Sequence, residues 1–177
     1  IEAWNVSAQT NFRNAARYLI APSTGAGDVV ITWSAAADES CGGVVVFTGV
    51  DQTTPIDTPP TPANGNDNAP TINVASAVND LVVDNYYGGR KTLTVGAGQT
   101  SRWTQDPIGA SNVAGACSTE LGAATVTMSW SAAAGTLGWI IGGASINPSA
   151  APPPVDVTQW NSPTESIVLE PETVVSY

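Results

Sequence analysis

The chain has 177 residues, enough for one sizeable hydrophobic core. Charged residues make up 11 % of it and the net charge is −10, so its surface should repel nucleic acid and anionic lipid. Histidine is absent, which excludes Ser-His-Asp and Cys-His catalysis and most zinc chemistry. We therefore expect no enzyme, no cofactor, no metal and no membrane insertion.

Short apolar runs separated by Gly, Pro, Asn and Asp clusters predict an all-β, antiparallel β-sandwich. Residues 11–20 fit either a short helix or a strand that ends in a turn. The most apolar run lies in GGVVVFTGVDQTTP (residues 42–55) and predicts a central strand over 44–50, covered on both faces and followed by a polar turn. Further strands are expected over residues 28–34, 71–76, 80–87, 91–95, 100–105, 125–131 and 138–146. In 125–131, Val126, Met128 and Trp130 should point inward.

Proline-rich segments divide the chain. Residues 53–71 carry five prolines and are expected to form a loop. Residues 149–156 (SAAPPPVD) predict a stiff spacer between a sandwich domain, residues 1–148, and a strand-bearing tail, residues 157–177. The tail sequence ESIVLEPETVVSY alternates, and it places Ile167, Leu169, Val175 and Tyr177 on one face. Pro171 restricts this strand to a sheet edge or a bulge.

Several phrases occur in the order of a recurrent module of secreted bacterial and phage-derived proteins. They are YLIAPSTGAGDVVITWS, GGVVVFTGVDQTTP, NDLVVDNYYGG, VGAGQTSRW, STELGAATVTMSWS and WIIGGASINP, from Tyr18 to Pro148. The chain resembles this jelly-roll or lectin-like sandwich family. The resemblance implies an extracellular or cell-surface location, a binding, adhesive or structural role, and no catalytic residues. Unlike such modules, this chain has little sequence before the first phrase and continues beyond the last.

These departures suggest self-assembly. A sandwich that lacks its starting strands has an open groove, which a strand-bearing tail could fill. If the tail folds back, the protein is a monomer; if it enters the next subunit, the head-to-tail contact propagates into a fibre. We expect the fibre-forming structural subunit, with Ile167, Leu169, Val175 and Tyr177 as its assembly strand. The alternatives are a carbohydrate-binding or adhesin module, and a virion fibre or decoration protein.

Two cysteines, Cys41 and Cys117, are expected to form a disulfide if the protein is secreted, or to be buried thiols otherwise. A bridge across so long a loop would contribute about 4 kcal/mol. Few lysines and many threonines favour the secreted interpretation. Because the chain begins with Ile1, we interpret it as a mature chain whose leader has been removed.

Six tryptophans are many for this length. Trp33, Trp130 and Trp139 alternate with apolar neighbours and should lie in the core. The other three, Trp4, Trp103 and Trp160, are candidate glycan contacts, with core or subunit interface as the alternative.

Three weaker signals remain. Asn5 begins an Asn-Val-Ser sequon and is a possible glycosylation site. Residues 64–68 (NGNDN), with Asp57, offer oxygen ligands for calcium but lack the spacing of a known calcium loop. Glu170 and Glu172 would share one face of a strand at the separation of glycosidase carboxylates, although a solvated strand face explains them better.

Overall fold

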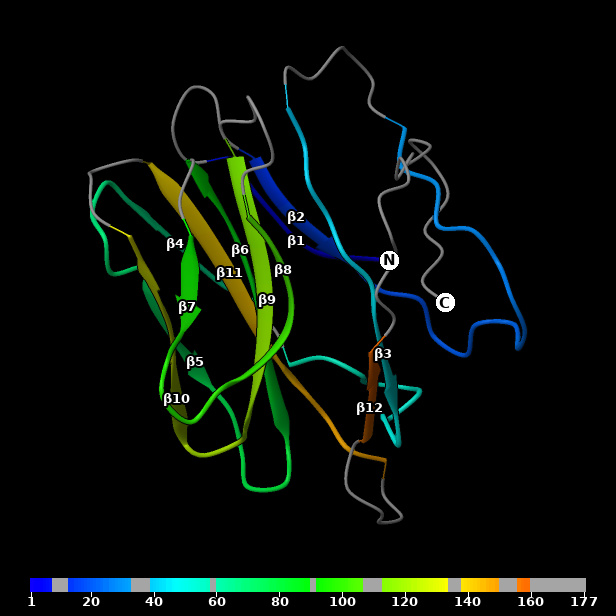
Figure 1. The fold of residues 1–177 in the computed structure, drawn as a ribbon. Helices are drawn as coiled ribbons and strands as arrows, with labels where there is room; N and C mark the ends of the chain where they lie inside the picture. The colour runs from blue at the N-terminus through cyan, green and yellow to red at the C-terminus, as the bar shows by residue number, and fades with distance from the viewer. Residues whose placement is uncertain are drawn as a thin grey trace.

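The computed structural model describes residues 1–7, 13–32, 39–57, 60–89, 92–106, 113–133, 138–149 and 156–159. The described residues form twelve strands and no helix, which confirms the all-β prediction (Figure 1). The strands are β1 (Glu2–Ser7), β2 (Arg13–Arg17), β3 (Val45–Thr48), β4 (Thr61–Gly65), β5 (Thr71–Ala75), β6 (Leu81–Gly89), β7 (Leu93–Val95), β8 (Thr100–Gln105), β9 (Val113–Leu121), β10 (Thr125–Ala132), β11 (Trp139–Ile146) and β12 (Asp156–Gln159).

Two antiparallel sheets form the sandwich. The larger has five strands in the order β4-β11-β6-β9-β8, and the smaller has three in the order β5-β10-β7. Figure 1 shows the three-stranded sheet packed against one face of the five-stranded sheet. The core therefore lies between β10 and its neighbours on one side and β11, β6 and β9 on the other.

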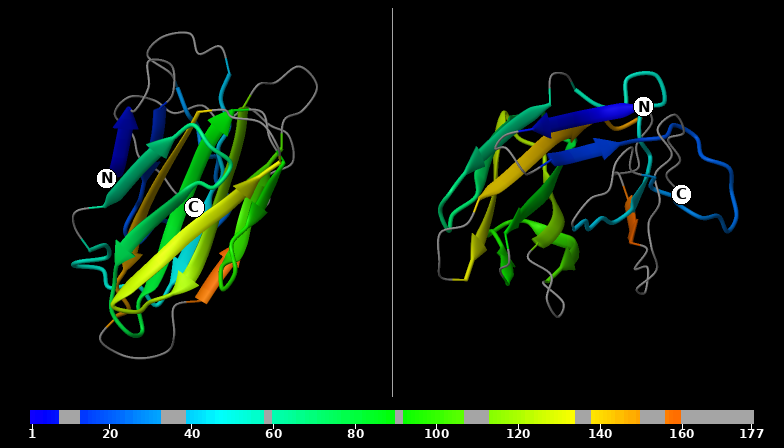
Figure 2. Two further views of the ribbon diagram at one scale, coloured as in Figure 1. Left: turned by 90° about the vertical axis from the view of Figure 1, so that its left-hand side faces the viewer. Right: turned by 90° about the horizontal axis from the view of Figure 1, so that it is seen from above.

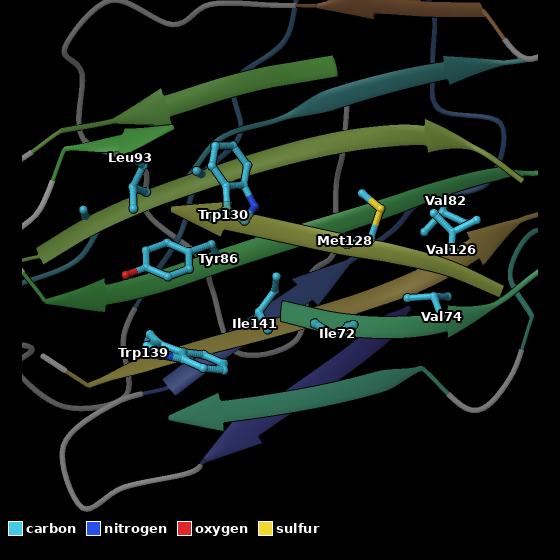
Figure 3. Packing of buried hydrophobic residues seen from close by; sticks show 12 residues of the cluster. Ile72, Val74, Val82, Tyr86, Leu93, Val126, Met128, Trp130, Trp139 and Ile141 are labelled. Carbon is cyan, nitrogen blue, oxygen red and sulfur yellow. The ribbon is translucent and has the colours of Figure 1, made fainter. Parts of the chain in front are cut away.

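Alternation along the strands fills this core. Strand β10 buries Val126, Met128 and Trp130 and exposes the residues between them, as the sequence predicts. Figure 3 shows the aromatic side chains gathered toward one end of the sandwich and the valines toward the other. The buried cluster consists of Ile72, Val74, Val82, Tyr86, Leu93, Ala114, Ala116, Val126, Met128, Trp130, Trp139 and Ile141.

The second face of the five-stranded sheet is covered too. Two separate two-stranded sheets, β1-β2 and β12-β3, lie along it (Figure 2). Strand β11 is consequently buried at every position, and β9 is buried from Val113 to Thr119. The sandwich therefore has a third, incomplete outer layer.

The prediction of a central strand over residues 44–50 is wrong. Strand β3 pairs only with β12 within the described residues, and Val45–Phe47 are half-buried. Apolar residues on both faces of this segment predicted a strand buried on both sides. They could not predict that the strand lies in a small outer sheet. The polar turn that follows is present, because Asp51 Oδ1 accepts the backbone N–H groups of Thr53 and Thr54 at 2.7 and 2.9 Å.

Other predictions were also revised. Residues 13–17 are the strand β2, which resolves the ambiguity over residues 11–20, and no strand is found over residues 28–32. The expected loop over residues 53–71 contains β4, where Pro62 is tolerated because β4 is an edge strand. Strand β9 was not predicted, since its sequence VAGACSTEL is rich in small residues.

The N-terminal hairpin packs onto a glycine of β11. Trp4 is 7 % exposed, and its indole lies over Gly142. A Cβ atom at this position would lie 2.6 Å from Trp4 Cδ1 and 2.7 Å from Trp4 Cε2, which real Cβ contacts do not allow. Gly142 is thus required for the approach of the indole.

We expect Gly142→Ala to lower the free energy of unfolding by about 1 to 3 kcal/mol, because the indole must move away from β11. Chemical denaturation would measure this change. The control is the same substitution in a Trp4→Ala background, where most of the additional loss should vanish. Equal losses in both backgrounds would show that the indole is not what restricts position 142.

Candidate functional site

A carboxylate lies inside the core. Asp84, on β6, has no exposed surface and points between the two main sheets. Its Oδ1 accepts hydrogen bonds from Ser118 N at 2.7 Å and Ser118 Oγ at 2.8 Å, and its Oδ2 accepts one from Trp130 Nε1 at 2.8 Å. One side chain therefore joins β6 to β9 within a sheet and to β10 across the core.

The polar network continues to the loop between β7 and β8. Gln99 Nε2 donates to Ser118 Oγ at 2.6 Å, and Gln99 Oε1 accepts from Ser129 N at 2.7 Å. The loop is thereby fixed to both sheets. Such a network, when its members are satisfied, specifies strand register.

Burial raises the pKa of Asp84 to about 7, against the opposing effect of its three hydrogen-bond donors. A carboxyl with this pKa holds a proton near neutral pH, a property of some catalytic acids. Here, however, the side chain is enclosed by the core, and a substrate could reach it only if the sheets separated. Among the described residues, no group of three or more Cys, Asp or Glu side chains is arranged to hold a metal ion. The network is therefore best explained as structural.

The two cysteines are free thiols, so the structure does not support the expected disulfide. Cys41 packs over Gly115 of β9, and Cys117 lies two residues further along the same strand. Burial raises the pKa of Cys41 to about 12 and raises that of Cys117 well above its ordinary value. Both thiols are protonated and poorly nucleophilic at neutral pH.

The two candidate glycan contacts that the structure describes, Trp4 and Trp103, are not brought together. Trp4 is buried beneath the N-terminal hairpin, which removes its ring from any sugar. Trp103, on β8, is half-buried with its ring between Gly43 and Gly115. Trp160 lies outside the described residues, as does Trp33. Trp130 and Trp139 lie in the core, as predicted.

The candidate calcium loop is a structural turn. Asp67 Oδ1 accepts from Ala69 N at 2.9 Å and from Trp139 Nε1 at 3.1 Å. Asp57 is engaged elsewhere, where Asn147 Nδ2 donates to its Oδ1 at 3.1 Å. The Oδ1 atoms of Asp67 and Asp57 thus serve separate structural contacts. Glu170 and Glu172 lie outside the described residues.

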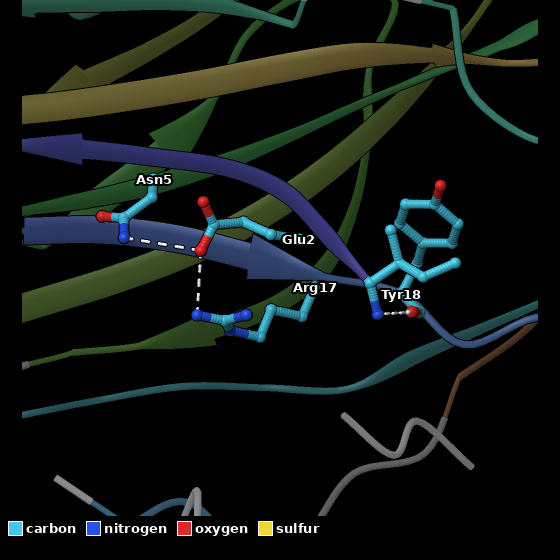
Figure 4. A network of polar contacts seen from close by, with 5 residues as sticks. Glu2, Asn5, Arg17 and Tyr18 are labelled. Carbon is cyan, nitrogen blue, oxygen red and sulfur yellow. Dashed lines mark hydrogen bonds and ion pairs between the residues drawn. The ribbon is translucent and has the colours of Figure 1, made fainter. Parts of the chain in front are cut away.

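The hairpin of β1 and β2 carries several polar contacts (Figure 4). Arg17 and Glu2 form an ion pair at 2.8 Å, and the Ile1 amine donates to Tyr18 O at 2.9 Å. Asn5 is exposed and donates to Glu2 Oε2 at 3.5 Å. Its glycosylation remains a prediction, for which exposure is a necessary condition.

A single buried asparagine ties this hairpin to the main sheet. Asn14 Oδ1 accepts from Trp4 Nε1 at 3.1 Å, and Asn14 Nδ2 donates to Asn85 O at 2.7 Å. The sequence does not predict this role of Asn14, since an Asn in an ambiguous segment gives no signal of burial.

The remaining candidate is the pair of β3 and β12. Its register joins Asp156 to Thr48, Val157 to Phe47, Thr158 to Val46 and Gln159 to Val45. The beginning of the predicted tail is therefore an added strand on the most apolar run of the chain. The predicted assembly residues Ile167, Leu169, Val175 and Tyr177 lie outside the described residues.

No protein-family model, curated protein or solved structure matches the chain. The described part of the chain contains no helix of the length and apolarity needed to cross a membrane. The candidate site therefore depends on geometry alone.

We expect a pH-dependent contribution to stability from Asp84. Its pKa in the folded chain lies above the ordinary 3.8, so the contribution is full below about pH 4 and is lost as the pH rises through about 7. At 1.36 kcal/mol per pH unit the loss is about 4 kcal/mol. Urea unfolding of Asp84→Asn between pH 4 and 8 should lack this decline, apart from a constant offset for the altered hydrogen bond with Trp130.

The matched control is Asp51→Asn. Asp51 is half-buried in a surface turn, and the backbone N–H groups of Thr54 and Thr53 hold its pKa below the ordinary value. Its contribution is lost only as the pH falls below about 4, so the decline between pH 4 and 7 should persist in this variant. A decline of wild-type size in Asp84→Asn would mean that another group causes it.

Proposed function

We propose that the chain is a non-enzymatic extracellular structural subunit that assembles with its own copies by exchanging its C-terminal tail. The observation that carries the proposal is the pairing of β3. This strand contains most of the most apolar run in the sequence, yet it is half-buried, and its described strand partner is β12, at the junction of spacer and tail.

A two-stranded sheet is marginally stable by itself in water. In the structure β12 pairs with β3 of its own chain, and β12 of another copy has the same sequence and can form the same hydrogen bonds. Exchange of an identical strand between copies forms oligomers at little cost in free energy. When the resulting head-to-tail contacts do not close into a ring, they generate a fibre.

The connection to β12 is short and proline-rich, although in the structure it leads β12 to β3 of the same chain. Ser149 N donates to Gly49 O at 2.7 Å, which fixes the start of the spacer beside the end of β3. Residues 150–155 then contain three consecutive prolines, which restrict the directions in which the tail can leave. Short, stiff hinges promote strand exchange between copies. The extracellular location is supported by the low lysine content and by the resemblance to secreted modules.

Removal of residues 166–177 should abolish assembly, because the alternating strand is lost. Sedimentation velocity over a hundredfold concentration range, with negative-stain electron microscopy, would measure this. We expect the full chain to grow into long particles with concentration and the truncated chain to remain small.

The control is a full-length chain in which the same twelve residues are scrambled to remove the alternation. It keeps the length and charge of the tail and should not assemble. Identical fibres from the truncated or the scrambled chain would contradict a role of residues 166–177 in assembly, and exchange of β12 alone would then be the remaining route.

A further inference from the structure

The polar network around Asp84 contains both a nucleophile and an electrophile. Its place in the core keeps external substrates out, but the Gln99 carboxamide and the Ser118 hydroxyl belong to the chain itself. Gln99 Nε2 lies 2.6 Å from Ser118 Oγ. Since the amide carbon of Gln99 is about 1.3 Å from Nε2, it lies within about 4 Å of the hydroxyl oxygen. An oriented nucleophile attacks from about 3 to 3.5 Å, so only a small movement separates the two groups from reaction.

Asp84 is placed to act as the general base for the Ser118 hydroxyl. Its Oδ1 accepts the hydroxyl proton in a hydrogen bond of 2.8 Å, so the O–H bond already points at the carboxylate. Ser118 N and Trp130 Nε1 hold the carboxylate in this orientation at 2.7 and 2.8 Å. Burial raises the pKa of Asp84 to about 7, which is the range in which a general base works at neutral pH.

The carbonyl oxygen of Gln99 lies against two donors. Gln99 Oε1 accepts from Ser129 N at 2.7 Å and from Ser129 Oγ at 3.3 Å. Because a backbone N–H can only donate, this contact fixes the amide with its oxygen toward β10 and its nitrogen toward Ser118. Gly96 permits the approach, since a Cβ atom there would collide with Gln99 Oε1 and Ser129 Oγ. The two donors would stabilise negative charge that develops on Oε1 during an attack on the amide carbon.

The surroundings shield the hydroxyl from water but leave a way out for a leaving group. Asp84 and Ser118 have no exposed surface, which hinders water from competing for the amide carbon. Gln99 is half-buried and follows the exposed residues Ala97 and Gly98 in the loop. Ammonia released from the amide can therefore reach the solvent, where its dilution prevents the reverse reaction.

We propose that Ser118 and Gln99 form an intramolecular ester cross-link, which joins β9 to the loop between β7 and β8. Rotation about the Cγ–Cδ bond of Gln99, a torsion with a broad preference, turns the carbonyl carbon toward Ser118 Oγ. The Ser118 proton passes to Asp84 as the Oγ–Cδ bond forms, and Ser129 stabilises the negative charge on Oε1. Asp84 then returns the proton to Nε2, the Cδ–Nε2 bond breaks, and ammonia leaves.

The cross-link adds a property to the proposed structural subunit and does not depend on exchange of the tail. All the participating residues belong to β6, β9, β10 and the β7–β8 loop of one chain. Ser118 and Gln99 are 19 residues apart, and a covalent bond between them persists when the chain unfolds. It would thus restrict the unfolded chain and stabilise the fold.

Mass spectrometry of the full chain tests the cross-link. Formation of the ester releases one ammonia molecule, so we expect the intact mass to fall by about 17 Da. In the denatured chain trypsin cleaves after Arg102, between Gln99 and Ser118, and residues 103–177 contain no further Lys or Arg. The peptide of residues 92–102 should remain attached to that of residues 103–177, and mild alkali, which hydrolyses esters, should separate them.

Substitutions identify the participating groups. Gln99→Met and Ser118→Ala should each keep the full mass and give separate peptides, and the half-buried loop position of Gln99 keeps the test valid if Ser118→Ala does not fold. Asp84→Asn lacks the base and should lower the cross-linked fraction of freshly purified chain at least about tenfold. Gln105→Met is the matched control, since the Gln105 amide donates to Asp106 O, and it should cross-link as the wild type does. Near-UV circular dichroism checks that each variant is folded.

Three outcomes would overturn the proposal. The first is a wild-type chain that keeps its full mass through several days at neutral pH. The second is a loss of about 17 Da without joined peptides, which would indicate ammonia loss elsewhere, such as a cyclic imide at Asn64-Gly65. The third is conversion of Gln99 to glutamate, which would show that water attacks the amide in place of Ser118. Joined peptides in folded Ser118→Ala would likewise exclude Ser118 as the nucleophile.

Discussion

The whole architecture depends on the need to cover the five-stranded sheet on both of its faces. Its middle strands, β11, β6 and β9, carry apolar or small residues on each side, so a single partner sheet cannot bury them. The three-stranded sheet covers one face in the ordinary manner of a sandwich. The other face is covered by separate pieces, each held by a few specific contacts, and these pieces leave β6 partly uncovered.

Polar contacts rather than apolar volume determine where these pieces lie. Asn14 holds the hairpin to β6 through the Asn85 carbonyl, and Gly142 admits the Trp4 ring. In the core, Asp84 fixes three strands relative to one another through Ser118 and Trp130. A buried carboxylate with a raised pKa lowers the free energy of unfolding near neutral pH, whereas its hydrogen bonds fix the register of the strands that they join. This combination of lower stability and fixed register is characteristic of a structural polar network.

Strands whose residues alternate or are β-branched, such as β5, β6 and β10, could be predicted from the sequence. It was insufficient where tertiary context overrides local preference. Strand β9 has small residues because Cys41 and Trp103 pack against it, and only the fold reveals those neighbours. The candidate site was not foreseen: β12 precedes residues 165–177, for which the tail strand was predicted and which lie outside the described residues. The pairing of β12 with β3 cannot be read from periodicity.

The position of Val44–Phe47 (VVVF) in the outer sheet explains why the pairing of β3 matters for the proposed assembly. An apolar strand at the centre of a sheet is protected, whereas the same strand in a small outer sheet is an exposed template for other chains. Proteins usually protect such edges with charges or prolines, but Val44–Phe47 has neither. Strand β12 covers one edge of β3, and under the proposed exchange this cover comes from another copy. The unprotected apolar strand and the short strand that pairs with it are the two features on which the proposed exchange rests.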